Sequence, residues 1–315
     1  MTESYAPVLL KGSHRMDDFQ IENGELKKYW GREDRVVIPE GTVSIGYRAF
    51  FRRASVKEII IPDGVRKIGI SAFQGCTSLK TIYIPESAVD IGEEAFCGCE
   101  SLPEITLPRR LKRFSSYLLS HCNALSRIAV PDGIETLGRG SMESCVSLKD
   151  AVIPESVTEI GAYAFRGCSS LRLALPDHVA VVGSNALDGV PVLHLDLDRM
   201  GKGGVCDGSD GVWAAAVRGF LVRFAEGTTA PMENAEWQSY IARRKPKLFA
   251  VLGDDPMLYR YLAETNAISP SRIPSMLDKT ESPECRAILL DYANKRKKRK
   301  RSTERIVDDL FGLDD

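Results

Sequence analysis

The stretch IPDGVRKIGISAFQGCTSLKTIY, residues 61–83, returns as IPESAVDIGEEAFCGCESLPEIT in residues 84–106. Its apolar, glycine, phenylalanine and cysteine positions recur after 23 residues. A fixed period of this length is typical of stacked structural units. We predict seven units, each with proline at its second position, which start at Ile38, Ile61, Ile84, Leu107, Val130, Ile153 and Leu175.

Each unit is expected to contain a short strand followed by a turn back under the sheet. Around residues 79–84, apolar and polar residues alternate, which places Ile82 and Ile84 inward and Thr81 and Tyr83 outward. The set that turns back under the sheet comprises Val65, Ile68, Ala72 and Phe73. Gly69 allows the chain to bend where a side chain would be in the way.

These residues resemble the BspA-like class of leucine-rich repeats, whose pattern has the form IPxxVxxIGxxAFxGCxSLxxI. The resemblance covers residues 17–198 and implies a curved right-handed solenoid with a parallel sheet on its concave side. The unit from Leu107 departs from the pattern, because Phe114, Ser115 and Leu118-Leu119 replace the usual IG and AF pairs. This departure predicts a bend or a loosening of the stack. The last unit carries Leu187 and Val190 at the Phe and Cys positions, as a capping repeat does.

Residues 17–37 are predicted to cap the stack at its beginning. Phe19 and Ile21 alternate with polar residues before Asn23-Gly24, a two-residue turn signal, and Leu26 and Tyr29 follow. This pattern predicts a hairpin.

Five of the eight cysteines recur once per unit and should form a column through the core; they are Cys76, Cys99, Cys122, Cys145 and Cys168. Sulfurs in successive turns would lie about one strand spacing apart, about 4.8 Å, so distance alone does not exclude disulfides. Five cysteines in a row cannot all pair, however. Buried free thiols that act as small hydrophobes are the favoured interpretation, and they suit a reducing compartment.

After Asp198 the period ends, and helices are predicted. Apolar residues at helical spacing indicate one helix over 212–224, a second over 233–244 and a short one around 248–252. Asp255-Pro256 and Ser282-Pro283 are N-cap signals, and Ile273-Pro274 should open a shorter helix. The stretches LYRYLAETNAIS and CRAILLDY resemble ankyrin-type helix pairs.

The predicted fold class is therefore α+β, a leucine-rich repeat solenoid followed by a small helical domain. The predicted organisation is an N-terminal segment 1–16, a cap 17–37, a solenoid 38–198, a Gly-rich linker 199–211, a helical domain 212–294 and a charged tail 295–315.

Composition limits the possible functions. With 42 basic and 43 acidic residues the net charge is −1, which argues against a global attraction to nucleic acid or to anionic membranes. No stretch of about 18 apolar residues predicts a transmembrane helix. The first residues show no apolar run of the length that a secretory signal needs, so a cytoplasmic location is expected. The BspA-like resemblance suggests a bacterial source.

The outward strand positions are the first candidate binding site, because solenoids bind along such columns. The candidate residues are Glu58, Ile60, Thr81, Tyr83, Glu104, Thr106, Arg127, Asp150, Arg172, His194 and Asp196. Tyr83 and Arg127 are of the types that often anchor interfaces. The alternative is an ordinary exposed sheet face.

The basic run Lys295 to Arg301 could contact phosphates or act as a nuclear-import signal, but it contains no aromatic residue for stacking on single strands. A solvated tail is the simpler interpretation. Cys206 in the loop CDGSDG weakly resembles the Cys-x-Asp motif of bacterial ubiquitin ligases, but the acid is adjacent to the cysteine, and a connector is favoured. Neither this loop nor the scattered histidines have the spacing of a metal or phosphate site.

No cofactor, metal site or enzymatic activity is therefore predicted. We expect a non-enzymatic protein-interaction module or adaptor that binds a protein partner through the concave solenoid face. One alternative is a secreted or surface adhesin, or a host-directed effector that could be ligase-like, with the repeats for target recognition. Another is a nucleic-acid-associated protein that acts through Lys295 to Arg301.

Overall fold

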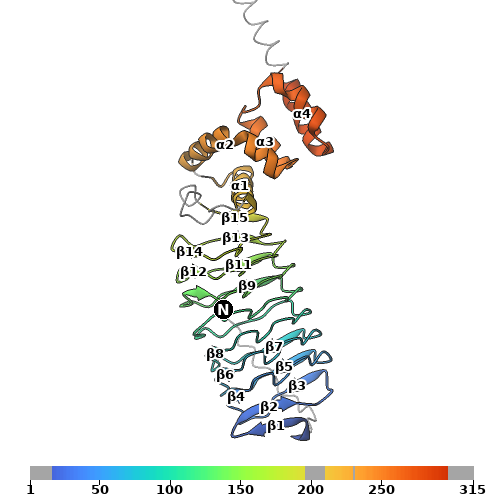
Figure 1. The fold of residues 1–315 in the computed structure, drawn as a ribbon, viewed down its shortest axis with the longest axis vertical. Helices are drawn as coiled ribbons and strands as arrows, with labels where there is room; N and C mark the ends of the chain where they lie inside the picture. Colours follow the sequence, from blue (N-terminus) through green and yellow to red (C-terminus); the bar gives the residue numbers. More distant parts are fainter. Residues whose placement is uncertain (1–15, 196–209, 230, 297–315) are drawn as a thin grey trace, which may run out of the picture. The chain divides into compact units, whose positions relative to one another are not determined.

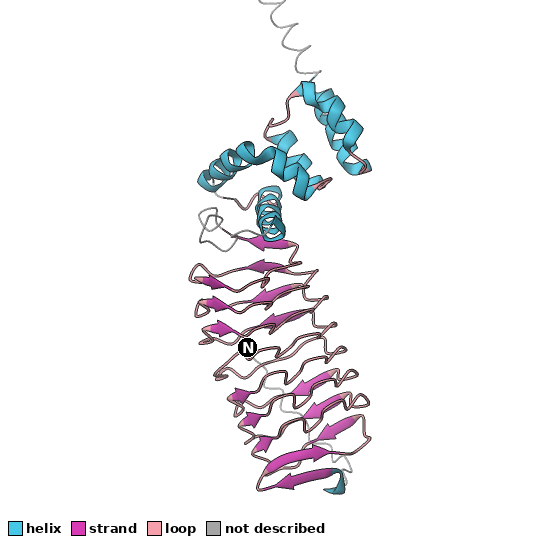
Figure 2. Cartoon of the chain, in the orientation of Figure 1, coloured by secondary structure: helices cyan, strands magenta, loops and turns pink. Residues whose placement is uncertain are grey.

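The computed structural model describes residues 16–195, 210–229 and 231–296 (Figure 1). The chain divides into two compact units, Met1–Val192 and Leu193–Asp315. The first is a stack of parallel turns built from strands, and the second is helical (Figure 2). The predicted fold class, a parallel-strand solenoid followed by helices, is confirmed.

One three-residue strand recurs in nearly every turn, directly before the Ile-Pro pair. These long strands are β3 (Arg35–Val37), β5 (Glu58–Ile60), β7 (Thr81–Tyr83), β9 (Arg127–Ala129), β11 (Asp150–Val152), β13 (Arg172–Ala174) and β15 (Val192–His194). The pairing is parallel, and equivalent residues of successive units lie opposite one another, as in the register Ile59 with Ile82. The alternation is as expected, because Ile82 is buried while Thr81 and Tyr83 are exposed.

A second column of two-residue strands lies at the Ile-Gly positions, where the sequence indicated only a turn. These short strands are β4 (Ser44–Ile45), β6 (Lys67–Ile68), β8 (Asp90–Ile91), β10 (Thr136–Leu137), β12 (Glu159–Ile160) and β14 (Val181–Val182). They also pair in parallel, with Lys67 opposite Asp90. The core lies between the two columns, where Val65, Ile68, Ala72 and Phe73 are fully buried.

A column of glycines fixes how closely successive turns approach. A Cβ added at Gly69 would lie 2.7 Å from the carbonyl carbon of Gly46, and one at Gly92 would lie 2.6 Å from the backbone nitrogen of Ile70. No side chain fits at these distances. The glycine column comprises Gly46, Gly69, Gly92, Gly138, Gly161 and Gly183. In the unit that starts at Leu107, Ser115 takes this place.

Both strand columns are interrupted at that same unit. Residues 102–108 have no strand, so β7 is the edge of one sheet (β3-β5-β7) and β9 is the edge of another. In the short column, β8 and β10 likewise belong to different sheets, and only an isolated bridge joins Phe114 to Leu137. The aromatic stack of the core, with ring centroids 5.5 Å apart between Phe73 and Phe96, stops at Phe96 because the next turn has Leu119 there.

The expected capping hairpin is present. A short 3-10 helix, Met16–Asp18, leads into β1 (Phe19–Glu22), which pairs antiparallel with β2 (Glu25–Tyr29). The turn residues Asn23 and Gly24 both have positive φ, as the asparagine–glycine signal requires. β2 then pairs in parallel with β4, so the hairpin continues into the short-strand column.

The helical unit contains α1 (Asp210–Ala225), α2 (Pro231–Leu252), α3 (Pro256–Glu264), a 3-10 turn Pro270–Arg272 and α4 (Ile273–Lys279), and residues 283–296 are also helical. The two helices predicted over 233–244 and 248–252 are one continuous helix, α2, so that prediction was wrong. Phe220 stacks on Trp237 with centroids 4.8 Å apart, which joins α1 to α2.

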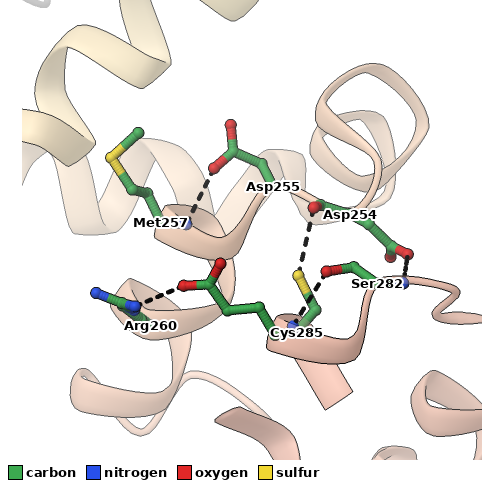
Figure 3. A network of polar contacts seen from close by, with 7 residues as sticks. Asp254, Asp255, Met257, Arg260, Ser282 and Cys285 are labelled. Carbon is green, nitrogen blue, oxygen red and sulfur yellow. Dashed lines mark hydrogen bonds and ion pairs between the residues drawn. The ribbon is translucent and has the colours of Figure 1, made fainter. Parts of the chain in front are cut away.

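Two adjacent acids tie the ends of these helices together (Figure 3). Asp255 is the predicted N-cap of α3, because its carboxylate accepts the Met257 N–H at 3.0 Å. The Asp254 carboxylate accepts the N–H groups of Glu281 and Ser282 at 2.7 and 2.9 Å. The Ser282 hydroxyl caps the last helix by accepting the Cys285 N–H at 3.3 Å.

Candidate binding surfaces

The predicted binding residues occupy the outward side of the long strands, which we call the strand face. Glu58 and Ile60 lie on β5, Thr81 and Tyr83 on β7, Arg127 on β9, Asp150 on β11, Arg172 on β13 and His194 on β15. Glu104 and Thr106 are exposed but lie in the interrupted unit, outside any strand. Asp196 lies outside the described residues.

Ile60 contributes little to this surface. Its exposed fraction is 9%, against 40% for Tyr83 and 63% for Val152. In the strand register it lies between Val37 and Tyr83. It was predicted as an outward contact residue, but it lies nearly within the core.

Three charged residues of the strand face are neighbours in register. Asp150 lies opposite both Arg127 and Arg172 on the adjacent strands. All three side chains are exposed, and no ion pair joins them among the described residues. By contrast, Arg35 and Glu58 pair at 3.1 Å across β3 and β5. The carboxylate and the two guanidinium groups around Asp150 are therefore available to an external partner.

The interrupted unit also opens a groove on the short-strand side. Its volume is about 700 Å³, and its lining includes Glu93, Lys112, Arg113, Phe114 and Glu135. Arg113 is held at one side by an ion pair of 2.8 Å with Asp90. The groove carries mixed charge and exposes no large apolar side chain apart from Ile70, which is 49% exposed.

The five periodic cysteines are buried free thiols. Each sulfur donates a hydrogen bond to a backbone carbonyl 26 residues earlier, for example Cys122 Sγ to Phe96 O at 3.3 Å. Desolvation by burial raises the pKa of the Cys76 and Cys168 thiols to about 12, and it raises the pKa of the three thiols between them well above the ordinary range. Thiols held neutral in this way are poor nucleophiles and poor metal ligands, which leaves them a packing role.

An arginine-rich corner at the first repeat was not identified from the sequence. Arg48 lies over the rings of Tyr47 and Phe51, at 5.0 and 4.6 Å from the guanidinium carbon to the ring centroids, and Arg52 lies over Phe51 at 5.1 Å. Tyr47 is 60% exposed. The interleaving of aromatic and arginine residues in YRAFFRR was the signal that could have found it.

In the helical unit, a hollow of about 640 Å³ lies between α3 and the last helix, and its lining includes Arg260, Glu264, Asp291, Lys295 and Arg296. Lys295, the first residue of the basic run, pairs with Asp291 at 2.7 Å. Residues 297–301 and Cys206 lie outside the described part of the chain. Within that part, no group of three or more His, Cys, Asp or Glu side chains could hold a metal ion.

None of the helices in the described ranges is both long and apolar enough to cross a membrane.

Comparison with known proteins identifies the repeats. The family model described as "BspA type Leucine rich repeat region" matches residues 43–172 in six copies. Residues 43–172 are a BspA-type leucine-rich repeat region. None of the curated proteins matches the chain. Because the family match ends at residue 172, the ankyrin-like resemblance of the helical unit stays a prediction.

Two solved structures of leucine-rich proteins are similar to this chain. The T. pallidum leucine-rich repeat protein is 29% identical, with a TM-score of 0.55 over 59% of this chain and 92% of its own. A leucine-rich cell surface protein from Faecalibacterium prausnitzii A2-165 is also 29% identical, with a TM-score of 0.50 over 56% of this chain. The match spans only 52% of that protein, about half of its length.

Proposed function

We propose that the chain is a non-enzymatic protein-interaction module that binds a protein partner through the strand face of its BspA-type repeats. Leucine-rich repeat proteins generally bind proteins rather than catalyse reactions. A stacked solenoid presents a preformed surface, so little conformational entropy is lost at the interface upon binding.

The observation that supports this surface best is the unpaired charge around Asp150. A guanidinium, a carboxylate and a second guanidinium follow one another at the strand spacing, about 4.8 Å, with no ion pair between them. Partners with the opposite order of charges would gain three pairings and would be steered into one register.

An aromatic side chain on the other side of the interrupted unit, Tyr83, would complement this charged set. Tyr83 ends β7 and Arg127 begins β9, and these strands border the interrupted unit on its two sides. Two turns separate their strands, about 10 Å at the strand spacing, and Tyr83 is in addition two residues further along its strand than Arg127. An aromatic and an arginine at this separation form a two-point anchor of the kind found at interface hot spots.

The test is affinity capture from lysate of the source organism with three baits, quantified by mass spectrometry. The first bait is the intact chain, and the second carries Tyr83→Ala and Arg127→Glu. The third, a matched control, carries Trp30→Ala and Arg110→Glu, which remove an exposed aromatic and reverse an exposed arginine outside the strand face. We expect a partner that the intact and control baits recover and that the strand-face variant loses.

Equal recovery by all three baits would contradict the strand face as the binding surface. A fourth bait that ends at Ala293 tests the alternative. Recovery that depends on the segment after Ala293, or nucleic acid that is recovered only with it, would place binding at the basic tail.

A surface location is a second possibility for where this binding occurs. The F. prausnitzii protein with the same repeat architecture is described as a cell surface protein. Protease shaving of intact cells distinguishes this location from the cytoplasmic one. A surface protein loses its repeat peptides to the protease, whereas a cytoplasmic protein keeps them.

A further inference from the structure

The arginine corner combines aromatic rings with arginine side chains that are unpaired among the described residues. We define it by Tyr47, Arg48, Phe51 and Arg52, whose side chains alternate aromatic ring and guanidinium. In the described part of the chain neither Arg48 nor Arg52 forms an ion pair or donates a side-chain hydrogen bond. The corner therefore holds two positive charges without a carboxylate partner.

A guanidinium that stacks on a ring is oriented without losing its donors. An aromatic ring within about 6 Å attracts the cation but offers no strong acceptor atom, so the N–H edges of the guanidinium stay free to donate. These edges match the two oxygens of a carboxylate or phosphoryl group in a bidentate contact. The stacked arginines are thus arranged in advance to bind an oxyanion.

A second arginine–aromatic cluster in the same solenoid shows the contrast. Arg139 lies over the ring of Tyr163 at 4.7 Å, but its Nε donates to the Tyr117 hydroxyl at 2.9 Å. Arg166 also stacks on Tyr163, and its guanidinium pairs with Glu143. There the guanidinium edges are used within the chain, whereas at the arginine corner they are not.

A hollow of about 410 Å³ begins at the arginine corner and extends along the stack. Arg52, Gly75, Gly98 and His121 hold the same position in four successive turns, and all of them line it. Gly75 and Gly98 have no side chains that could fill it, and Arg52 and His121 are the first and last of the four along the stack.

The backbone at these four positions has positive φ, between 57° and 73°. Glycine adopts this conformation freely, whereas for any other residue the conformation is unfavourable by about 1 kcal/mol. Arg52 thus takes a position that favours glycine, and its side chain lines the hollow. Strained positions of this kind are often retained where the side chain has a function.

The dimensions and charges of the hollow define its ligand. Three turn spacings span about 14 Å, which is the length of about four extended residues. The positive charge lies at the Arg48 and Arg52 end, and Glu100 also lines the hollow. A continuous polyanion such as nucleic acid would meet this carboxylate, whereas a peptide with a single anionic side chain would not.

We propose that this hollow binds a short extended protein segment, with one phosphoryl or carboxylate group held by Arg48 and Arg52. This site lies at the turns that follow the short strands, so it is separate from the strand face and does not depend on it. The repeats then have two binding surfaces, one for the partner described above and one for an acidic or phosphorylated segment.

The test uses the full chain and three fluorescein-labelled peptides of one alanine-rich sequence, with phosphoserine, glutamate or glutamine at the central position. We expect fluorescence anisotropy to show binding of the phosphoserine and glutamate peptides and none of the glutamine peptide. Arg48→Gln with Arg52→Gln should weaken binding at least tenfold. Arg48→Lys with Arg52→Lys keeps both positive charges but removes the guanidinium groups that make bidentate contacts. This variant should weaken binding less.

Two controls separate a built site from general charge attraction. Arg109→Gln with Arg110→Gln removes two exposed arginines for which no ring contact is found in the described residues, and it should leave affinity unchanged. Phe51→Leu keeps both arginines but removes the ring between them, and it should weaken binding. Circular dichroism melts establish that each variant is folded.

Any of four results would overturn the proposal. These are failure of both anionic peptides to bind, an equal loss with Arg109→Gln and Arg110→Gln, full affinity in Phe51→Leu, or tighter binding of a thymidine oligonucleotide than of either peptide. Stronger binding of phosphoserine than of glutamate would assign the site to phosphorylated segments, and the reverse order would assign it to acidic ones.

Discussion

The hydroxyl of Ser115 donates a hydrogen bond to the carbonyl oxygen of Ile91 at 2.5 Å. In the other turns this carbonyl position accepts the backbone N–H of the column glycine, as Ile68 O accepts Gly92 N at 2.8 Å. Because Ser115 has a Cβ where the column leaves no room for one, its hydroxyl supplies the hydrogen bond in place of the backbone. Both strand columns are interrupted in this same unit.

Ser115→Ala is expected to destabilise the solenoid by about 1 kcal/mol. The substitution keeps the Cβ but removes the side-chain donor to Ile91 O, and such a hydrogen bond contributes about 0.5 to 1.5 kcal/mol. Urea denaturation followed by circular dichroism measures the change. Ser116→Ala is the matched control because no hydrogen bond of its hydroxyl is found in the described structure, and it should leave the midpoint unchanged. Equal midpoints for the two variants would contradict this role.

Gly161→Ala is expected to destabilise the stack by about 3 kcal/mol, the upper range for overpacking. The new Cβ would lie 2.7 Å from Leu137 O and 2.8 Å from the backbone nitrogen of Arg139. Both contacts are backbone atoms, so relief requires the turns to separate. Gly133→Ala is the control, since it has open space but positive φ, and it should cost only about 1 kcal/mol. The prediction fails if the control is as costly.

The buried thiols should make the solenoid sensitive to alkali. Burial raises the pKa of Cys76 and Cys168 from about 9 to about 12, so between these values the unfolded chain releases protons that the folded chain retains. The stabilisation is complete below pH 9 and is lost as pH rises toward 12, by about 1.4 kcal/mol per pH unit for each thiol. Urea unfolding under reducing conditions between pH 8 and pH 11 measures this decline.

A variant with Cys76→Ala and Cys168→Ala is the comparison for the alkaline experiment. It should be less stable at pH 8 because two buried sulfurs are lost, but its stability should fall less steeply with pH. Parallel slopes for the two proteins would show that these thiols do not cause the decline.

Asp254→Asn is expected to loosen the last helix by about 2 kcal/mol, because one carboxylate oxygen accepts both the Glu281 and the Ser282 N–H. The Ser282 N–H, more than the other groups, lowers the pKa of Asp254 below its ordinary value. The stabilisation is therefore present above that ordinary value and is lost as pH falls through the folded pKa. Hydrogen exchange of amides in residues 283–296 should become faster in the variant.

Asp278→Asn on α4 is the control for this effect. Its carboxylate is exposed and has no hydrogen bond or ion pair in the described structure. If this control exchanges as fast as Asp254→Asn, the helix does not depend on the Asp254 cap.

The sequence by itself determined the repeat, the capping hairpin and the helix starts. These features depend on local chemistry: a fixed spacing of apolar residues, Asn23-Gly24 in a tight turn, and Asp255 before Pro256 at an N-cap. Such signals act within a few residues of the chain, so they can be recognised without knowing what lies opposite. The continuity of α2 was not predicted; the helix contains Pro246, a residue that is uncommon in helix interiors.

Only the tertiary structure decided where the surfaces are. The second strand column, the burial of Ile60 and the break at Ser115 depend on contacts between residues about 23 positions apart, which are adjacent only after the turns stack. The hollow between Arg52 and His121 also depends on stacking. It is lined by Gly75 and Gly98, which have no side chains and lie in the two turns between them. A periodic sequence specifies the repeating unit. The candidate binding sites arise where successive units carry different residues at the same repeat position and these residues become neighbours in the stack.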